Sequence, residues 1–323
     1  MSAVAAVGAG RMGRGIAIAF AYAGHDIDLI DLKVRDDSTW ARLREDALTE
    51  IRASLVDLAE LEVMPADAVD RIAARVHLVR AEAAPAALAK SEVVFEGVPE
   101  TLAAKGEAFA QLSSHCPAQT ILASTTSTIL VADLIPLVIH PERLINAHWL
   151  NPAFVIPLVE LSAHAGTTQL VIDRLRTLLE GIGKVPVLCG PAPGYIVPRL
   201  QALIMNEAAR MVEEGVATPA DIDKATRYGL GLRFAALGVV EFIDFGGNDI
   251  LYYASKYLAA NLSRERYTAP EIVERHMREN KNGLRAGQGF YDYSGRDLAT
   301  YRKDVMARTL GMLRHAGLLR APK

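Results

Sequence analysis

The stretch Val4-Ala5-Ala6-Val7-Gly8-Ala9-Gly10-Arg11-Met12-Gly13 decides the fold of this 323-residue chain. Its apolar residues predict a short buried strand, and the spacing Gly-x-Gly-x-x-Gly predicts a turn that opens a helix. In that context Gly8 allows the tight turn, Gly10 lets the backbone approach a pyrophosphate, and Gly13 lets the helix pack on the strand. The stretch therefore predicts a dinucleotide site at the N-terminus of the helix.

Asp31 indicates which dinucleotide this site binds. It follows the second predicted strand, 26–30, and lies eighteen residues after Gly13. A carboxylate there accepts hydrogen bonds from both ribose hydroxyls and repels a 2′-phosphate, so NAD is favoured over NADP. Lys33 and Arg35 weaken that preference. The alternative, a glycine turn that binds no nucleotide, is disfavoured by the strand–turn–helix context.

The composition describes a soluble globular protein with room for two domains. The chain is 51% hydrophobic, carries a formal net charge of −3 and scatters its lysines and arginines, which disfavours a nucleic-acid partner. No apolar run approaches the roughly 20 residues of a membrane span. The first strand begins almost at Met1, so no cleavable leader is expected. Cys116 and Cys189 form neither a disulfide framework nor a metal site, so we expect a cytoplasmic protein without metal.

Short strands and helices alternate along the first 188 residues. This alternation predicts an α/β domain with a Rossmann-type doubly wound sheet, covered by helices on both faces. Helices at 38–62 and 65–75 are expected to form an arm over 38–75. Strands are predicted at 3–7, 26–30, 76–79, 92–95, 120–123, 144–147, 157–161 and 185–189, and further helices at 13–23, 99–112, 128–137 and 168–182.

After Gly190-Pro191-Ala192-Pro193-Gly194 the pattern changes to helices only. We therefore expect an NAD-binding domain at 1–188 with its helical arm, and an all-α domain at 189–323 for substrate binding and dimerisation. The predicted helices of the second domain span 195–215, 237–262, 269–280 and 299–316, with a helix after Thr218-Pro219.

His148 is a polar residue in an otherwise apolar run, and Glu160 follows twelve residues later. A histidine with a carboxylate to orient its ring is the usual equipment for moving a proton at neutral pH. Ser127 comes after a predicted strand, and the strand ends of such a sheet gather at the crevice where ligands bind. Taken singly, Ser127 is a helix-capping hydroxyl, His148 a core histidine and Glu160 a surface acid; together they indicate a site for proton transfer.

These segments and the glycine turn resemble the 3-hydroxyacyl-CoA dehydrogenase family, and the resemblance covers nearly the whole chain. The segments that carry it are Gly-x-Gly-x-Met-Gly-x-Gly at 8–15, Ser-Thr-Thr-Ser at 124–127, His-x-x-Asn-Pro at 148–152, Pro-Gly-Tyr-Ile-Val at 193–197, Glu-Asn-Lys at 279–281 and Gly-Gln-Gly-Phe-Tyr at 287–291.

The resemblance implies reversible, NAD-dependent oxidation of the 3-hydroxy group of a 3-hydroxyacyl-CoA, a role in fatty acid metabolism and a homodimer. It implies that His148 is the base that removes the hydroxyl proton and that Glu160 holds its ring. The further implied contacts are those of Ser127 and Asn151 with the substrate and of Glu100 and Lys105 with the cofactor.

Three features depart from the family pattern. Pro198 stands where the family has an active-site asparagine, so either a donor to the substrate carbonyl is lost or a proline is merely tolerated in a first helical turn. Residues 36–75 hold ten acids and five arginines but no lysine, a poor match for the phosphates of CoA. Gly231-Leu232-Arg233-Phe234-Ala235 resembles the branch that handles free hydroxy acids, which includes L-gulonate 3-dehydrogenase, lambda-crystallins and carnitine dehydrogenase.

The departures leave alternatives to the thioester, which whole-chain resemblance favours modestly. The second reading is a dehydrogenase of a free 3-hydroxy acid, gulonate- or carnitine-like, whose carboxylate pairs with Arg233; equally, Arg233 is a surface arginine. The third is a non-catalytic NADH-binding or structural protein, which an intact His148, Glu160 and Ser127 argue against. The β-hydroxyacid dehydrogenases with a catalytic lysine are disfavoured, because helix 195–215 contains none.

Overall fold

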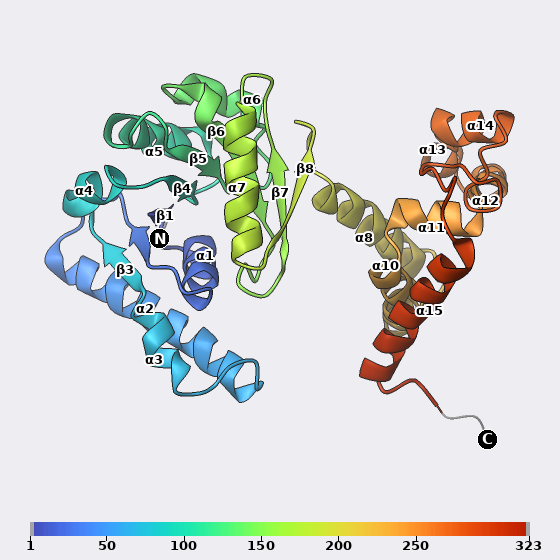
Figure 1. Cartoon of the computed structure of the whole chain (residues 1–323), viewed down its shortest axis with the longest axis horizontal. Coiled ribbons are helices and arrows are strands. Elements are labelled where there is room, and N and C mark those ends of the chain that lie inside the picture. The colour runs from blue at the N-terminus through green and yellow to red at the C-terminus, as the bar shows by residue number, and fades with distance from the viewer. Residues whose placement is uncertain (1–2, 321–323) are drawn as a thin grey trace. The chain divides into compact units, whose positions relative to one another are not determined.

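A computed structural model describes residues 3–320 of the chain (Figure 1). The chain divides into two compact units, residues 1–204 and 205–323. The domain boundary expected near residue 188 stays a prediction, because compactness does not establish which segment folds on its own. Among the described residues, no helix has the length and apolar character that crossing a bilayer requires.

The first unit is built on one sheet, in which the described residues form eight strands in the order β3-β2-β1-β4-β5-β6-β7-β8. Neighbouring strands from β3 to β6 pair in parallel, which confirms the predicted Rossmann-type sheet. The strands are β1 Val4–Val7, β2 Ile27–Ile30, β3 Val76–Val79, β4 Val93–Glu96, β5 Ile121–Ser124, β6 Leu144–Trp149, β7 Leu158–Ser162 and β8 Val185–Cys189.

Strand β7 runs antiparallel to β6, and β8 is parallel to β7. The connection between β6 and β7 spans only residues 150–157, whereas a parallel crossover needs a dozen residues or more. The short connection therefore requires a reversal of direction, which alternation alone had not indicated.

Helices cover both faces of the sheet, and each face has its own apolar cluster. Successive residues of a strand point to opposite faces, so in β1 Ala6 joins Phe20 of α1 while Val7 joins Phe109 of α5 in the other cluster. The helices of this unit are α1 Arg11–Tyr22, α2 Asp37–Glu60, α3 Ala68–Ala73, α4 Ala84–Leu88, α5 Leu102–His115, α6 Val131–Leu134 and α7 Gln169–Gly181.

Helices α2 and α3 occupy the region 38–75 in which an arm is expected. Asp36 caps α2 by accepting a hydrogen bond from the Thr39 amide, and only one stripe of the helix is buried. The stripe consists of Ala47, Ile51 and Leu55, so most of the acidic residues of the arm face solvent.

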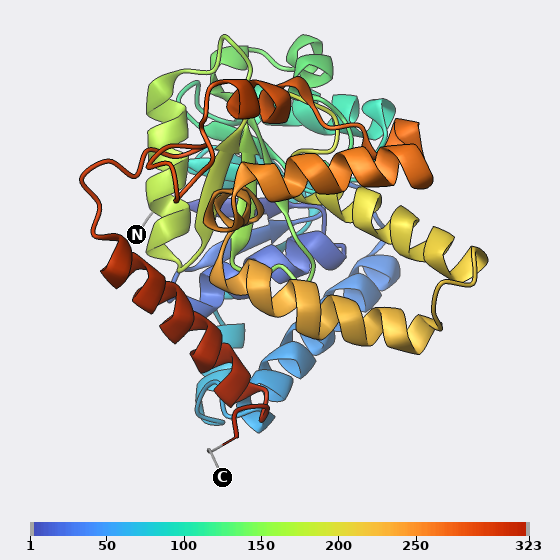
Figure 2. The same ribbon diagram turned by 90° about the vertical axis from the view of Figure 1, so that its right-hand side faces the viewer.

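The second unit is helical among its described residues (Figures 1 and 2), as predicted. The single helix expected at 237–262 is two helices, because Gly247 adopts a φ of +108°, outside the helical region. Helix α8 begins in the first unit and continues into the second. The helices are α8 Val197–Glu213, α9 Pro219–Ala225, α10 Leu232–Ala236, α11 Val239–Gly246, α12 Asn248–Asn261, α13 Arg264–Tyr267, α14 Glu271–Arg278 and α15 Leu298–His315, with a π-helical turn at Thr226–Gly231.

Asp244 of α11 explains the Gly-Gln-Gly-Phe-Tyr segment of the sequence. Its fully buried carboxylate accepts hydrogen bonds from the amides of Phe290 and Tyr291, at 3.0 and 2.8 Å. A Cβ on Gly289 would lie 2.2 Å from the Asp244 Oδ1 atom. This segment therefore packs the second unit around a buried carboxylate.

We predict that Gly13→Ala lowers the free energy of unfolding by about 3 kcal/mol, because overpacking against backbone forces the chain to shift. A Cβ on Gly13 would lie 2.0 Å from the Gly8 carbonyl oxygen. The control is Gly10→Ala, whose Cβ would meet no atom within 4 Å and whose cost should stay within about 1 kcal/mol. Urea unfolding measures both; equal effects would contradict the packing assigned to Gly13.

Candidate active site

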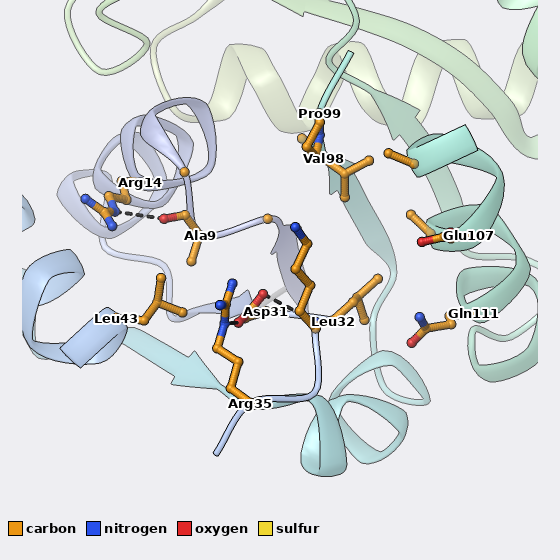
Figure 3. A pocket seen from close by; sticks show the side chains of 16 residues that line it. Ala9, Arg14, Asp31, Leu32, Arg35, Leu43, Val98, Pro99, Glu107 and Gln111 are labelled. Atoms are coloured by element: carbon orange, nitrogen blue, oxygen red, sulfur yellow. Dashed lines mark hydrogen bonds and ion pairs between the residues drawn. The ribbon is translucent and has the colours of Figure 1, made fainter. Parts of the chain in front are cut away.

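The glycine turn opens onto a pocket of about 600 Å³ at the ends of β1, β2 and β4 (Figure 3). Gly8 has a φ of +98°, and a Cβ there would lie 2.6 Å from the Gly97 carbonyl oxygen. Gly10 precedes α1 without any side-chain cap, so the first N–H groups of the helix are available to a ligand. Open space around Gly10 and a free helix N-terminus fit a pyrophosphate.

Asp31, the residue expected to receive the ribose, lines the same pocket, and its contact with the ribose stays a prediction. It is 6% exposed, and its carboxylate pairs with the guanidinium of Arg35. The amide of Lys33 also approaches its Oδ1 atom, at 3.4 Å. The sequence placed Asp31 at this strand end, but it did not reveal that Arg35 turns back onto the carboxylate.

His148 and Glu160 are direct partners across the antiparallel β6–β7 ladder. The His148 Nδ1 atom lies 2.9 Å from the Glu160 Oε2 atom, and both side chains are buried. Because a carboxylate only accepts, Nδ1 is assigned the proton and Nε2 is left as the accepting nitrogen of the ring. The arrangement suits a base that takes one proton at Nε2.

The second carboxylate oxygen of Glu160 holds the start of α8. Oε1 accepts hydrogen bonds from the amides of Ile196 and Val197, at 2.9 and 2.8 Å. A buried carboxylate is costly unless its bonds are satisfied, and the positive end of a helix is a favourable partner. Glu160 is therefore fixed from two sides, and so is the imidazole that it holds.

Tyr195 is a residue of the site whose role the sequence did not indicate. Its ring stacks on that of His148, with centroids 4.8 Å apart and planes 7° apart. Its hydroxyl donates to the Thr126 carbonyl at 2.8 Å and accepts from Asn146 Nδ2 at 3.1 Å. Burial raises the pKa of the Tyr195 phenol well above its usual value, so the ring stays neutral. In the sequence, the only feature that singled out Tyr195 was its place in the Pro-Gly-Tyr segment.

Glu100 organises the loop that carries Ser127. Its Oε1 atom accepts hydrogen bonds from the Thr126 hydroxyl and from the amides of Ser127 and Thr128, the latter two at 2.9 and 3.0 Å. These bonds explain why the helix predicted at 128–137 begins only at Val131. Burial alone would raise the pKa of Glu100, but the bonds from Thr126 and Thr128 and the charge of Lys105 outweigh it and lower the pKa to about 2. Cofactor contact by Glu100 stays a prediction.

Lys105 is fully buried beside a second carboxylate, Glu96, at the end of β4. Its ammonium lies 3.0 and 2.9 Å from the two Glu96 oxygens and 3.5 Å from Glu100. Ser124 donates to Glu96 at 2.6 Å. Sequence reasoning missed Glu96, because the strand predicted at 92–95 stops one residue before it. Cofactor contact by Lys105 stays a prediction.

The remaining candidate residues are Asn151, Pro198 and Arg233. Asn151 is exposed in the loop after β6, and Pro198 is the second residue of α8, where a proline costs no helical hydrogen bond. Arg233 belongs to α10 of the second unit, is exposed, and lies 5.8 Å from the Phe242 ring centroid. Across residues 3–320, no group of His, Cys, Asp or Glu could hold a metal ion.

Two models of known protein families match this chain. "3-hydroxyacyl-CoA dehydrogenase, NAD binding domain" matches residues 3–192, and "3-hydroxyacyl-CoA dehydrogenase, C-terminal domain" matches residues 194–293. The first match confirms the expected cofactor, NAD.

Relatives that are named for different activities resemble the chain about equally. A 5-formyl-3-hydroxy-2-methylpyridine 4-carboxylate 5-dehydrogenase of Mesorhizobium japonicum is 30% identical over 90% of each chain. A lambda-crystallin homolog of Homo sapiens is 32% identical over 79% of this chain and 77% of its own. The crystal structure of a 3-hydroxyacyl-CoA dehydrogenase of Archaeoglobus fulgidus is 30% identical, with a TM-score of 0.75 over 98% of this chain and 99% of that one.

We predict that the stabilising effect of Glu100 disappears in acid. The pKa of its carboxyl is lowered from 4.5 to about 2 in the folded chain, so the charged form favours folding above pH 4.5 and this contribution is lost as the pH falls towards 2. Glu100→Gln should therefore destabilise the protein at pH 7 and much less at pH 3, as measured by urea unfolding. A difference between variant and wild type that is the same at both pH values would contradict this account.

Proposed function

The chain belongs to the 3-hydroxyacyl-CoA dehydrogenase family of NAD-dependent oxidoreductases, and we propose that it oxidises the 3-hydroxy group of a 3-hydroxyacyl-CoA in a reversible reaction. The observation that carries the proposal is the bond between His148 Nδ1 and Glu160 Oε2, which leaves Nε2 as the accepting nitrogen. A whole-length relative of known structure bears the name of this activity.

Oxidation of a secondary alcohol releases one hydride and one proton, which must go to different acceptors. The pocket lined by Gly8, Gly10 and Asp31 would hold NAD, which would supply the acceptor for the hydride of the carbinol carbon. His148 takes the hydroxyl proton at Nε2, and the carboxylate of Glu160 stabilises the imidazolium that forms. Ser127 donates a hydrogen bond to the substrate oxygen from a loop that Glu100 holds. In the reverse direction His148 returns the proton to the ketone oxygen.

His148→Gln and Glu160→Gln should each lower kcat by about 10²–10⁴ while NADH binding stays within about twofold. The His148 variant has no base. In Glu160→Gln the amide oxygen can still accept from the α8 amides, so the NH₂ group faces Nδ1 and the ring proton moves to Nε2, the wrong tautomer. Stopped-flow kinetics measures the loss of turnover, and NADH fluorescence measures cofactor binding separately.

The control for these variants is His77→Gln, an exposed histidine on β3, which should leave turnover unchanged. Wild-type turnover in His148→Gln would refute the role of the imidazole. Loss of NADH binding in either variant would place the defect in folding rather than in proton transfer.

A free 3-hydroxy acid is the second candidate substrate, with Arg233 binding its carboxylate. Three observations favour it: Pro198 supplies no side-chain donor, the arm is acidic, and the Mesorhizobium japonicum relative is named for a carboxylate without CoA. A guanidinium binds a carboxylate through two parallel hydrogen bonds, and that of Arg233 is exposed.

One assay distinguishes the candidates: NADH production from 3-hydroxybutyryl-CoA, gulonate and carnitine, by wild type, Arg233→Met and the control Arg302→Met. Our proposal predicts that kcat/KM for 3-hydroxybutyryl-CoA exceeds that for gulonate or carnitine by at least about 100-fold, roughly the discrimination that well-matched polar contacts provide. It also predicts that Arg233→Met leaves kcat/KM for the thioester unchanged. Preference for a free acid, with a KM that Arg233→Met raises at least about tenfold, would replace the first candidate by the second. Turnover of none of them, with NADH still bound, would favour the non-catalytic reading.

The second unit also supports the proposal of a homodimer. Large apolar side chains are exposed on two of its helices, Met205 and Val212 on α8 and Tyr253 and Tyr257 on α12. Helices that leave apolar faces in water commonly pack against a partner. Cytoplasmic location and a place in fatty acid metabolism stay predictions.

A further inference from the structure

We propose that the dinucleotide pocket accepts NADP(H) as well as NAD(H), and that Arg35 is the residue that makes this possible. The proposal concerns the cofactor alone and does not depend on which alcohol the protein oxidises. It starts from the pairing of Arg35 with Asp31, the carboxylate expected to exclude a 2′-phosphate.

An aspartate at the end of the second strand discriminates against NADP by charge repulsion. Here the negative charge of Asp31 is already paired with a positive one, because the Arg35 Nε atom contacts Asp31 Oδ2 inside the pocket (Figure 3). The Asp31 side chain is 8% exposed and that of Arg35 is 26% exposed, so water screens the pair only partly. A guanidinium in direct contact with the carboxylate offsets most of the repulsion that the carboxylate exerts on an approaching phosphate.

Arg35 also has donors left for a phosphate. A guanidinium carries five N–H donors, and among the described residues the side chain of Arg35 has only its Nε bond to Asp31. Its two terminal nitrogens are therefore free to bind phosphate oxygens in the fork geometry that suits arginine.

Lys33 adds a second cation beside Arg35. It is exposed, lines the pocket and forms no ion pair within the described part of the chain. Arg14, the third cation of the lining, is already engaged by the Ala9 carbonyl and by Glu50. The part of the pocket around Asp31 thus presents two cations, Arg35 and Lys33, to a phosphate, against the one carboxylate of Asp31. Glu107, the other acidic residue that lines the pocket, comes from α5.

The test is direct binding, measured as the fluorescence change on titration with NADH and NADPH at one fixed ionic strength. We expect the Kd for NADPH to lie within tenfold of that for NADH, a difference of less than about 1.4 kcal/mol. Arg35→Gln should weaken NADPH binding about tenfold and leave NADH binding unchanged or tighter, because Asp31 then loses its competitor for the ribose. Lys33→Gln should weaken NADPH binding in the same direction.

Arg71→Gln is the matched control, since Arg71 is an exposed arginine on α3 that does not line the pocket. It should leave the ratio of the two Kd values unchanged. Rising salt should weaken NADPH binding more steeply than NADH binding, as a site of exposed charge requires. A wild-type ratio above ten, or a ratio that Arg35→Gln leaves unchanged, would overturn the proposal without touching the proposed reaction.

Discussion

The pairing of β6 with β7 is the constraint on which the site depends. The antiparallel register sets His148 opposite Glu160 and holds the imidazole and the carboxylate in hydrogen-bonding contact inside the core. A buried carboxylate with one partner would be costly, and here the amides of Ile196 and Val197, at the start of α8, supply two more. The residue just before them, Tyr195, stacks on the imidazole, so the start of α8 fixes both members of the pair.

A second set of charges, the buried Lys105 and Glu96 together with the more exposed Glu100, connects the strand beside the dinucleotide pocket with the loop of Ser127. Lys105 lies between Glu96, at the end of β4, and Glu100, which gathers the amides of Ser127 and Thr128. Networks of this kind lock a geometry when every member is bonded, because an unpaired buried charge is expensive. The loop of Ser127 and the strand beside the pocket are thereby held by the same ammonium group.

Much of the fold could be predicted from local sequence, because strand length, glycine turns and helix caps depend on neighbouring residues. The direction of β7 could not, since it follows from the short connection after β6 rather than from any pattern in the strand. Gly247 likewise interrupts a stretch whose apolar spacing indicated one helix. For β7 the constraint comes from outside the strand, whereas in the stretch 237–262 a single glycine inside it overrides the apolar spacing.

The candidate residues were found from sequence, but several of their partners were not. Glu96 and Tyr195 act through contacts between elements distant in the chain, and neither stands out as an individual residue. Arg35 was recognised as a charge near Asp31, whereas its contact with that carboxylate needed coordinates. Spacing identifies the groups that carry chemistry more readily than the groups that hold them.

The most direct test of this account is a crystal structure with NADH and a substrate analogue bound. Hydride and proton must leave one carbinol group towards two acceptors, each about 3–3.5 Å from its donor atom. The account predicts that the nicotinamide C4 atom and the Nε2 atom of His148 face the same substrate carbon–oxygen bond at such distances. A nicotinamide ring lying elsewhere, or an Nε2 atom turned away from the analogue, would contradict it.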